Sequence, residues 1–297
     1  MPEPRGILVF GDIIDDVVAV PSGPIRTDTD TASAIRFRPG GSAANTASWL
    51  GSVGASVRFI GIVGLDDAAR HSAELARHGV VPLLTEHPTL PTGAIVVIVD
   101  GETRTMLTER GANAVIDPEL VTDELLASSS LLHLTGHTLF GMHNPAQFTQ
   151  LIARARAAGI EVCVDPGSAG YIADFGVEQA LAYFDGATVL VPNLEEGRAL
   201  TGLVEPMAVA SKLAERFPVV ALTLDTNGVV VARTGETPVV VAAVATTVVD
   251  PTGAGDAFTA GFLHALLSTG EVDVAARAGV ALAARAVSAV GARPATH

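Results

Sequence analysis

Short apolar runs, rich in valine and isoleucine, alternate along the chain with alanine-rich stretches that have the period of a helix. Residues 7–12 and 57–64 are two such runs, and 43–54 and 67–79 are helical stretches that end at glycine. Strands that are apolar along their whole length need cover on both faces, and strands separated by helices pair in parallel. The alternation therefore predicts an α/β fold with a doubly covered, mostly parallel sheet.

Two segments depart from this alternation. Residues 94–113 have two β-rich arms around Asp100 and Gly101, and Asp-Gly between such arms is a strong hairpin signal. Residues 15–41 are also strand-like, with proline and glycine breaks and no helical period. We expect residues 1–297 to form a single domain in which these two insertions build a small β-sheet lid over a site at the strand ends.

The charge and the cysteine content limit the function classes. The 297 residues carry a net charge of -14, which repels nucleic acid and anionic membrane surfaces, so we expect neither as a partner. The one cysteine, Cys163, lies inside an apolar run and is predicted to be a core residue. It can form no intrachain disulfide, and no apolar run approaches the roughly 18 residues of a membrane helix, so a cytoplasmic location is predicted.

Residues 248–262, VVDPTGAGDAFTAGF, combine the end of an expected strand (239–249), a glycine turn and a helix. Glycine allows a close backbone approach to a ligand, and the free N–H groups and dipole of a helix N-terminus favour an anion. The turn at Gly253–Gly255, which includes Ala254, is therefore a candidate anion hole. Asp256 has two interpretations: it stabilises its own helix, or it accepts a proton from a hydroxyl that attacks a bound phosphoryl group.

Other phosphate-binding motifs are excluded. A dinucleotide fingerprint needs a small residue where this chain has Phe258. A Walker A loop needs a Gly-Lys pair, and the only lysine, Lys212, lies in a predicted surface helix. The protein-kinase scheme, which needs a strand lysine, fails for the same reason. If the chain binds ATP, it must use helix amides, Mg2+ and arginine.

The segment DPTGAGDAFTAGFL (250–263) resembles the C-terminal signature of the PfkB/ribokinase family of carbohydrate and nucleoside kinases. Other landmarks of that family follow in the same order over essentially the whole chain. The resemblance implies a ribokinase-like fold, ATP with Mg2+, Asp256 as the catalytic base, and Gly253, Ala254 and Gly255 as the anion hole.

The resemblance also implies substrate-binding residues. GDIIDD (11–16) would place Asp16 on substrate hydroxyls, and PGGSAANTA (39–47) would place Gly40, Gly41 and Asn45 at the sugar. Each has a structural alternative: a carboxylate at a strand end, a tight glycine turn, or a buried polar residue within a helix.

Four further substrate candidates follow from their positions. Arg104, Arg110 and Asn113 belong to the predicted lid hairpin and the residues after it, and such polar groups either face solvent or contact a polar substrate or its phosphate. Asp165 stands at the carboxyl end of a predicted strand, where α/β sheets bind ligands.

Two landmarks concern the nucleotide. PNLEEG (192–197) resembles the family's Asn-x-x-Glu motif, in which Asn193 and Glu196 would organise phosphates and Mg2+ through water; the same spacing is that of a capping box. ALTLDTNG (221–228) resembles the strand and turn beside the nucleotide. Asp225 stands there where the family often has glycine, so it either alters the nucleotide contact or points to solvent. The remaining residues assigned to the nucleotide are Thr223, Gly228 and Thr252.

Two departures from the family pattern bear on cations. Ser42 replaces a lysine that many members carry after the glycine pair. In some members a segment like 290–295 closes a monovalent-cation site together with Asp250 and Thr252, but Ala295 lacks the hydroxyl used there. The sequence therefore does not decide whether K+ binds at Asp250.

These observations predict an ATP-dependent kinase that phosphorylates a hydroxymethyl group of a sugar or sugar-like molecule. One alternative is a nucleoside or pseudouridine kinase on the same fold, although one tryptophan and two tyrosines offer little base stacking. Another is a non-catalytic sugar- or nucleotide-binding regulator, which the intact Gly-Ala-Gly-Asp disfavours. A homodimer through the lids is also expected, because an exposed sheet edge invites pairing.

Overall fold

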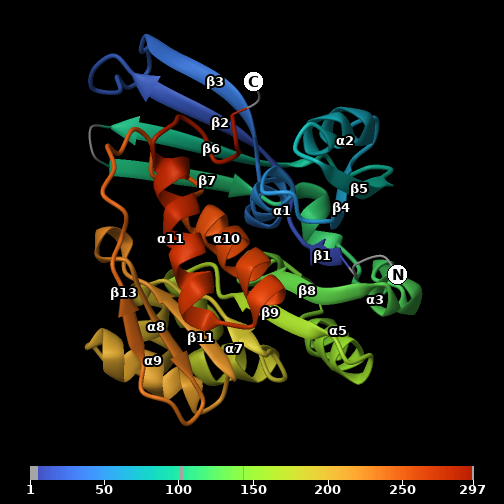
Figure 1. Ribbon diagram of the computed structural model, residues 1–297. Coiled ribbons are helices and arrows are strands. Elements are labelled where there is room, and N and C mark those ends of the chain that lie inside the picture. Colours follow the sequence, from blue (N-terminus) through green and yellow to red (C-terminus); the bar gives the residue numbers. More distant parts are fainter. Residues whose placement is uncertain (1–5, 101–102, 143, 296–297) are drawn as a thin grey trace.

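The computed structural model of the protein describes residues 6–100, 103–142 and 144–295. Within them a central sheet has nine strands in the order β13-β12-β11-β10-β9-β8-β1-β4-β5 (Figure 1). Neighbouring strands pair in parallel, except that β12 pairs antiparallel with both of its neighbours, β11 and β13. The strands are β1 (Gly6–Phe10), β4 (Val57–Gly64), β5 (Val80–His87), β8 (Ser129–Thr135), β9 (Glu161–Asp165), β10 (Val189–Leu190), β11 (Val219–Thr223), β12 (Val229–Arg233) and β13 (Val239–Val241).

Helices cover both faces of this sheet, as its apolar strands require. One face is covered by α1 (Ser42–Ser52), α2 (Ala68–Ala76), α10 (Ala254–Thr269) and α11 (Val272–Val287). The other is covered by α3 (Asp123–Ala127), α5 (Ala146–Ala157), α6 (Ala169–Phe175), α7 (Val177–Tyr183), α8 (Leu194–Thr201) and α9 (Pro206–Ala214). Four short turns of helix complete the connections: α4 (Gly136–Leu139), η1 (Gly111–Val115), η2 (Pro118–Leu120) and η3 (Asp225–Asn227).

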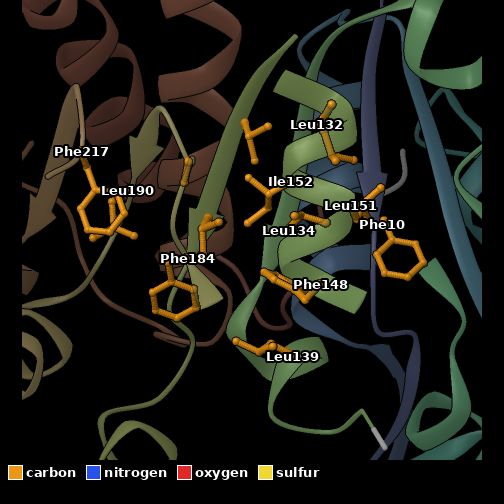
Figure 2. Packing of buried hydrophobic residues seen from close by; sticks show 14 of the residues in the cluster. Phe10, Leu132, Leu134, Leu139, Phe148, Leu151, Ile152, Phe184, Leu190 and Phe217 are labelled. Carbon is orange, nitrogen blue, oxygen red and sulfur yellow. The ribbon is translucent and has the colours of Figure 1, made fainter. Parts of the chain in front are cut away.

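Successive strand residues supply the two cores alternately, because side chains point to opposite faces of a sheet. In β1, Leu8 and Phe10 pack with α5 and its neighbours, whereas Ile7 and Val9 pack with α1 and α10. Figure 2 shows the first core, in which Phe10 lies beside side chains of β8 and of α5, such as Phe148. The buried strands are thus fixed in register from both sides, which holds the ends of the strands in place.

A second, four-stranded sheet stands at one end of the molecule (top of Figure 1). Its order is β3 (Ser33–Gly40), β2 (Ile14–Pro21), β6 (Gly93–Asp100) and β7 (Thr103–Glu109). The two insertions expected to form the lid, residues 15–41 and 94–113, therefore pair with each other through β2 and β6. The predicted fold class, a mostly parallel α/β sheet with a smaller β-sheet, is confirmed. Gly101, expected at the turn between β6 and β7, lies outside the described residues.

The expected strand at 239–249 is wrong beyond its first three residues. Only β13 pairs with β12, and residues 242–249 form no strand. The ladder ends there because Val241 pairs with Val229, the first residue of β12, and the turn at 225–228 precedes it. Val248 and Val249 are more than half exposed, and the N–H of Val249 donates to the carbonyl oxygen of Val287. An extended segment that rests on the end of α11 therefore leads into α10.

The parallel strands bring several polar residues to one edge of the central sheet. Asp12 follows β1, Thr135 and Asp165 end β8 and β9, Asn193 follows β10, and Thr223 ends β11. Parallel strands have their carboxyl ends at a common edge, where α/β proteins bind ligands. Among the described helices, none is long and apolar enough to cross a membrane.

Candidate active site

A cavity of about 490 Å³ lies at this edge, between the central sheet and the four-stranded sheet. Both sheets and the N-terminus of α10 contribute to its wall. Most of the predicted site residues line it: Asp16, Gly41, Asn45, Asn113, Asp165, Asn193, Glu196, Thr223, Thr252, Gly253, Ala254, Gly255 and Asp256.

The other predicted site residues lie outside the lining. Gly40 is buried next to Asp16, and a Cβ at position 40 would lie 2.4 Å from the Asp16 carboxylate. Asp225 is exposed with a φ of 50°, and Gly228 is buried behind it with a φ of 95°. Arg104 pairs with Val99 in the ladder between β6 and β7, and its side chain is outside what the structure describes.

The start of α10 lines the cavity and has backbone N–H groups without a partner among the described residues. Gly253 is the N-cap with a φ of 78°, a left-handed conformation that favours glycine. A Cβ there would also lie 2.4 Å from the carbonyl oxygen of Ala292, so a side chain cannot fit. The backbone N–H groups of Gly253 and Gly255 have no hydrogen-bond partner among the described residues. They are therefore available to an anion.

Asp250 holds the loop before this helix. Its Oδ1 accepts from the backbone N–H of Thr252 at 3.0 Å and from the Thr252 hydroxyl at 2.6 Å. Its Oδ2 accepts from the N–H of Gly291 at 3.1 Å. The carboxylate thereby ties the loop to the C-terminal segment. A role at a monovalent cation stays a prediction.

Asp256 faces the cavity from the first turn of α10. Its carboxylate accepts from the hydroxyl of Ser42 at 2.7 Å, from Asn45 Nδ2 at 3.1 Å and, at 3.5 Å, from the Thr46 hydroxyl. Burial raises the pKa of Asp256 to about 6, and the Ser42 and Asn45 bonds act in the opposite direction. The group is thus held in one orientation and titrates close to neutral pH, as a general base requires.

The orientation of Asn45 is set in turn by Arg293. Arg293 Nε donates to Asn45 Oδ1 at 3.0 Å, which directs the amide Nδ2 toward Asp256, and Arg293 Nη2 donates to the carbonyl oxygen of Gly40 at 2.8 Å. Arg293 is 8 % exposed, and burial lowers its pKa to about 10. Arg293 thereby supports both the orientation of Asn45 toward Asp256 and the glycine pair that precedes α1.

Asp12 performs the capping of α1. The N-cap of that helix is Gly41, with a φ of 91° and no side chain. Asp12, from the end of β1, accepts from the backbone N–H groups of Ser42 at 2.8 Å and Ala43 at 3.2 Å. This long-range cap fixes the helix that carries Ser42 and Asn45 beside Asp256.

Asp16 reaches the cavity from β2. Burial raises its pKa to about 6, while Arg293 lowers it and Asp12 raises it further. No side-chain hydrogen bond holds this carboxylate among the described residues. Asp16 is therefore free to accept hydrogen bonds from a polar ligand.

Asn193 and Glu196 form a capping box at α8, and both also line the cavity. Glu196 Oε2 accepts from the Asn193 N–H at 2.9 Å and Oε1 from its Nδ2 at 2.8 Å. Burial raises the pKa of Glu196 to about 7. Carboxylate oxygens suit Mg2+, and these oxygens already accept hydrogen bonds. The residues therefore fit an ion held through water better than a direct ligand.

Asp165 and Asn113 have structural partners within the site. Asp165 Oδ1 accepts from the N–H of Gly167 at 2.8 Å, and burial, followed by the nearby carboxylates of Glu196 and Asp256, raises its pKa well above the usual value. Asn113 is 5 % exposed, and its amide bonds both the N–H and the carbonyl oxygen of Ile13. Asn113 therefore holds the chain between β1 and β2 in position.

Sequence reasoning missed three residues that organise this site. Asp12 stands directly after a buried strand, and its place at a strand end could have identified it. Ser42 was identified only as a departure from a family pattern. Arg293, one of the chain's many arginines, gave no signal, because its contacts with Gly40 and Asn45 span about 250 residues of sequence.

Comparisons with known proteins identify the family and the fold of the chain. The profile of the pfkB family carbohydrate kinases matches residues 5–297. The bifunctional protein HldE of Escherichia coli O157:H7 is 31% identical over 285 residues, which cover 90% of this chain and 56% of the relative, so the chain spans about half the relative's length. Adenosine kinase from Sinorhizobium meliloti superposes with a TM-score of 0.87 at 25% identity, covering 98% of this chain and 96% of that structure. Ribokinase from Thermotoga maritima gives 0.81 at 25% identity, covering 99% and 97%.

Proposed function

The chain belongs to the pfkB family of carbohydrate kinases, and we propose that it transfers the γ-phosphoryl group of ATP to a hydroxymethyl group of a sugar or sugar-like molecule. Kinases of this family are phosphotransferases that act on hydroxyl groups and use ATP, generally with Mg2+. One observation carries the proposal: Asp256, oriented by Ser42 and Asn45, stands beside the unpaired amides at the start of α10.

In the proposed reaction the acceptor hydroxyl gives its proton to the Asp256 carboxylate. Its oxygen forms a bond to the γ-phosphorus while the bond from that phosphorus to the β,γ-bridging oxygen breaks, and ADP leaves. The N–H groups of Gly253 and Gly255 stabilise the negative charge on the transferring group. When bound, Mg2+ would supply charge neutralisation on the phosphates, and Asn193 and Glu196 would hold it through water.

The four-stranded sheet is proposed to act as a lid. Directly paired residues Asp16, Ile95 and Thr108 all line the cavity, so this row of the sheet faces the acceptor. Asp16 would accept hydrogen bonds from acceptor hydroxyls. Closure of the sheet would exclude water, which otherwise competes as the phosphoryl acceptor.

The opposite face of the lid is apolar, which supports a homodimer through the lids. The adjacent row runs across all four strands through Phe37, Val17, Val96 and Leu107. Phe37 is 79% and Leu107 57% exposed. Such a row of large apolar side chains favours burial against a second copy.

A nucleoside acceptor is the second candidate, because Tyr171 and His137 both line the cavity as a T-shaped ring pair, and aromatic side chains can bind a base. A panel of sugars, sugar acids, sugar phosphates and nucleosides, scored by ADP release, separates the two candidates. The non-catalytic alternative predicts ligand binding without ADP release from any acceptor.

Replacement of the base tests the proposed chemistry. We expect Asp256→Asn to lower kcat by about 10²–10⁴-fold, the usual contribution of a general base, without weakening ATP binding measured by calorimetry. Asp185→Asn, an exposed carboxylate that pairs with Arg216 on the surface, is the matched control and retains wild-type turnover. Full turnover by Asp256→Asn would refute the assignment of the base.

A further inference from the structure

One end of the cavity takes no part in the proposed phosphoryl transfer, and it is built around Arg110. This residue follows β7, and its guanidinium lies 5.1 Å from the centroid of the Tyr171 ring. Its Nη1 donates to the carbonyl oxygen of His137 at 2.7 Å. Arg110, His137 and Tyr171 all line the cavity. The guanidinium is therefore fixed on the wall by a cation–π contact and one hydrogen bond.

One edge of this fixed guanidinium remains open. Among the described residues Arg110 forms no ion pair, and its Nε and Nη2 have no hydrogen-bond partner. Comparable arginines of the chain do pair: Arg70 with Asp15 and Asp67, and Arg154 with Asp123. A half-buried charge without an opposite charge costs free energy. An arginine held in this state is typical of a ligand site.

The charge distribution of the cavity isolates Arg110. Five carboxylates line the cavity, and Arg110 is the single lysine or arginine in the described lining. None of those carboxylates contacts Arg110. The side chains that do contact it carry no negative charge. Burial lowers the pKa of His137, an effect that Asp12 opposes and Arg110 adds to, so its imidazole is neutral near pH 7. Arg110 therefore supplies the positive charge at this end of the cavity.

The position of Arg110 in the fold puts it on the acceptor side. Its carbonyl oxygen accepts from Asn113 Nδ2 at 3.2 Å, and the same amide donates to the carbonyl oxygen of Ile13, three residues before Asp16. Thr108, two residues before Arg110, belongs to the cavity-facing row of the lid that contains Asp16. The proposed nucleotide residues come instead from β11 and from the starts of α8 and α10.

We propose that Arg110 selects an acceptor that carries an anionic group, a carboxylate or a phosphate, at a distance from the hydroxyl that is phosphorylated. The proposal rests on the proposed function and names the substrate class of the same site. The free Nε–H and Nη2–H groups lie along one edge of the guanidinium, which matches two oxygens of a carboxylate or phosphate. Carbon atoms next to the anionic group would pack on the Tyr171 ring. A neutral sugar would leave the guanidinium unpaired.

Matched acceptors test the proposal. Glucose, gluconate and glucose 1-phosphate share a free primary hydroxyl at carbon 6 and differ in the group at carbon 1. Fructose and fructose 1-phosphate form a second set, and adenosine and pseudouridine serve as uncharged nucleoside acceptors. Acceptor kcat/KM is measured by ADP release with Mg2+, and acceptor binding by calorimetry without ATP. The variants are Arg110→Gln, Arg110→Lys and, as the control that removes an equal charge, Arg277→Gln on the exposed face of α11.

We expect wild type to prefer an anionic member of a set over its neutral partner by at least about 30-fold, the value of a charge-assisted bidentate contact. Comparison of the carboxylate acceptor with the phosphate acceptors identifies which anionic group Arg110 recognises. Arg110→Gln should remove that preference mainly through KM of the acceptor, with KM of ATP unchanged. Arg110→Lys should restore part of it, and Arg277→Gln should behave as wild type.

Four results would overturn the proposal. The first is equal use of neutral and anionic partners by wild type, the second is a preference that survives in Arg110→Gln, and the third is a KM effect confined to ATP. A preference for uncharged nucleosides over all anionic acceptors has the same consequence. If an anionic acceptor binds wild type, binds Arg110→Gln at least about tenfold more weakly and yet yields no ADP, the inference stands and the proposed function fails.

Discussion

The hydrogen bond from Ser42 to Asp256 controls the pH dependence that we expect for this enzyme. The Ser42 hydroxyl lies 2.7 Å from Asp256 Oδ1, and burial raises the pKa of Asp256 to about 6. A base acts in its deprotonated form, so kcat/KM should rise with pH through about 6 and then level. Ser42→Ala removes one donor to the charged form, and the pKa of Asp256 should therefore rise.

The size of the shift follows from the bond. A hydrogen bond to a charged group is worth about 1.5–3 kcal/mol, and 1.36 kcal/mol corresponds to one pKa unit. Because Ser42 is only partly buried, water can replace part of its contribution, so we expect the lower end, about one unit. At pH 7 the deprotonated fraction of Asp256 would fall from about 0.9 to about 0.5, and turnover should recover at pH 8.5.

The assay is a pH profile of kcat/KM for the acceptor, which reports the free enzyme. The pKa of Asp16 is also raised to about 6, so the wild-type rise should be steeper than a single titration, and Ser42→Ala should separate it into two steps. Ser48→Ala is the control: the Ser48 hydroxyl donates to the Ala44 carbonyl on the same helix and does not contact Asp256. A Ser42→Ala profile identical to wild type would refute the reasoning.

Two further predictions concern stability and assembly. Burial raises the pKa of Asp16 and Asp256 from 3.8 to about 6, so the folded chain binds more protons than the unfolded chain between about pH 4 and 7. That stabilisation is complete below pH 4 and is lost as pH rises through 6. The free energy of unfolding of Asp16→Asn should therefore exceed that of wild type at pH 7.5 by about 1–2 kcal/mol and equal it at pH 4. Urea unfolding of the unliganded chain measures both values. Equal pH dependence in both proteins would contradict it. Phe37→Asp should convert a wild-type dimer to a monomer in size-exclusion chromatography with light scattering, whereas a wild-type monomer at 50–100 µM would disprove the lid interface.

The sequence was sufficient for the layers of the fold because its periodicity is local. Apolar runs such as 57–64 became strands at the predicted bounds, and the hairpin arms on either side of Asp100 paired. The prediction failed at 242–249, where valine-rich sequence favours a strand but the neighbouring strand β12 begins opposite Val241 and does not extend beside it. Strand formation there depends on the position of the segment in the sheet, which local composition does not contain.

Residues near the glycine turns could be predicted as site candidates because their motifs are contiguous. The residues that hold these candidates in position could not be predicted, since they act through contacts between distant parts of the chain. Asp12 caps a helix 30 residues away, and Arg293 orients Asn45 across 248 residues. Arg110 was predicted only as one of two alternatives, solvated charge or ligand contact, and its contact with Tyr171 depends on where α6 packs.

The segment at 290–293 separates the stability of the fold from the order of the site. Arg38 donates to the carbonyl oxygen of Val290, and Trp49 Nε1 donates to that of Ala292 at 2.8 Å. Gly291 bonds Asp250 in the loop before α10, and Arg293 bonds Asn45 in α1. The segment contributes no strand to either sheet. A change confined to these four residues would therefore leave both sheets in place while it releases Asn45 and the Asp250 loop.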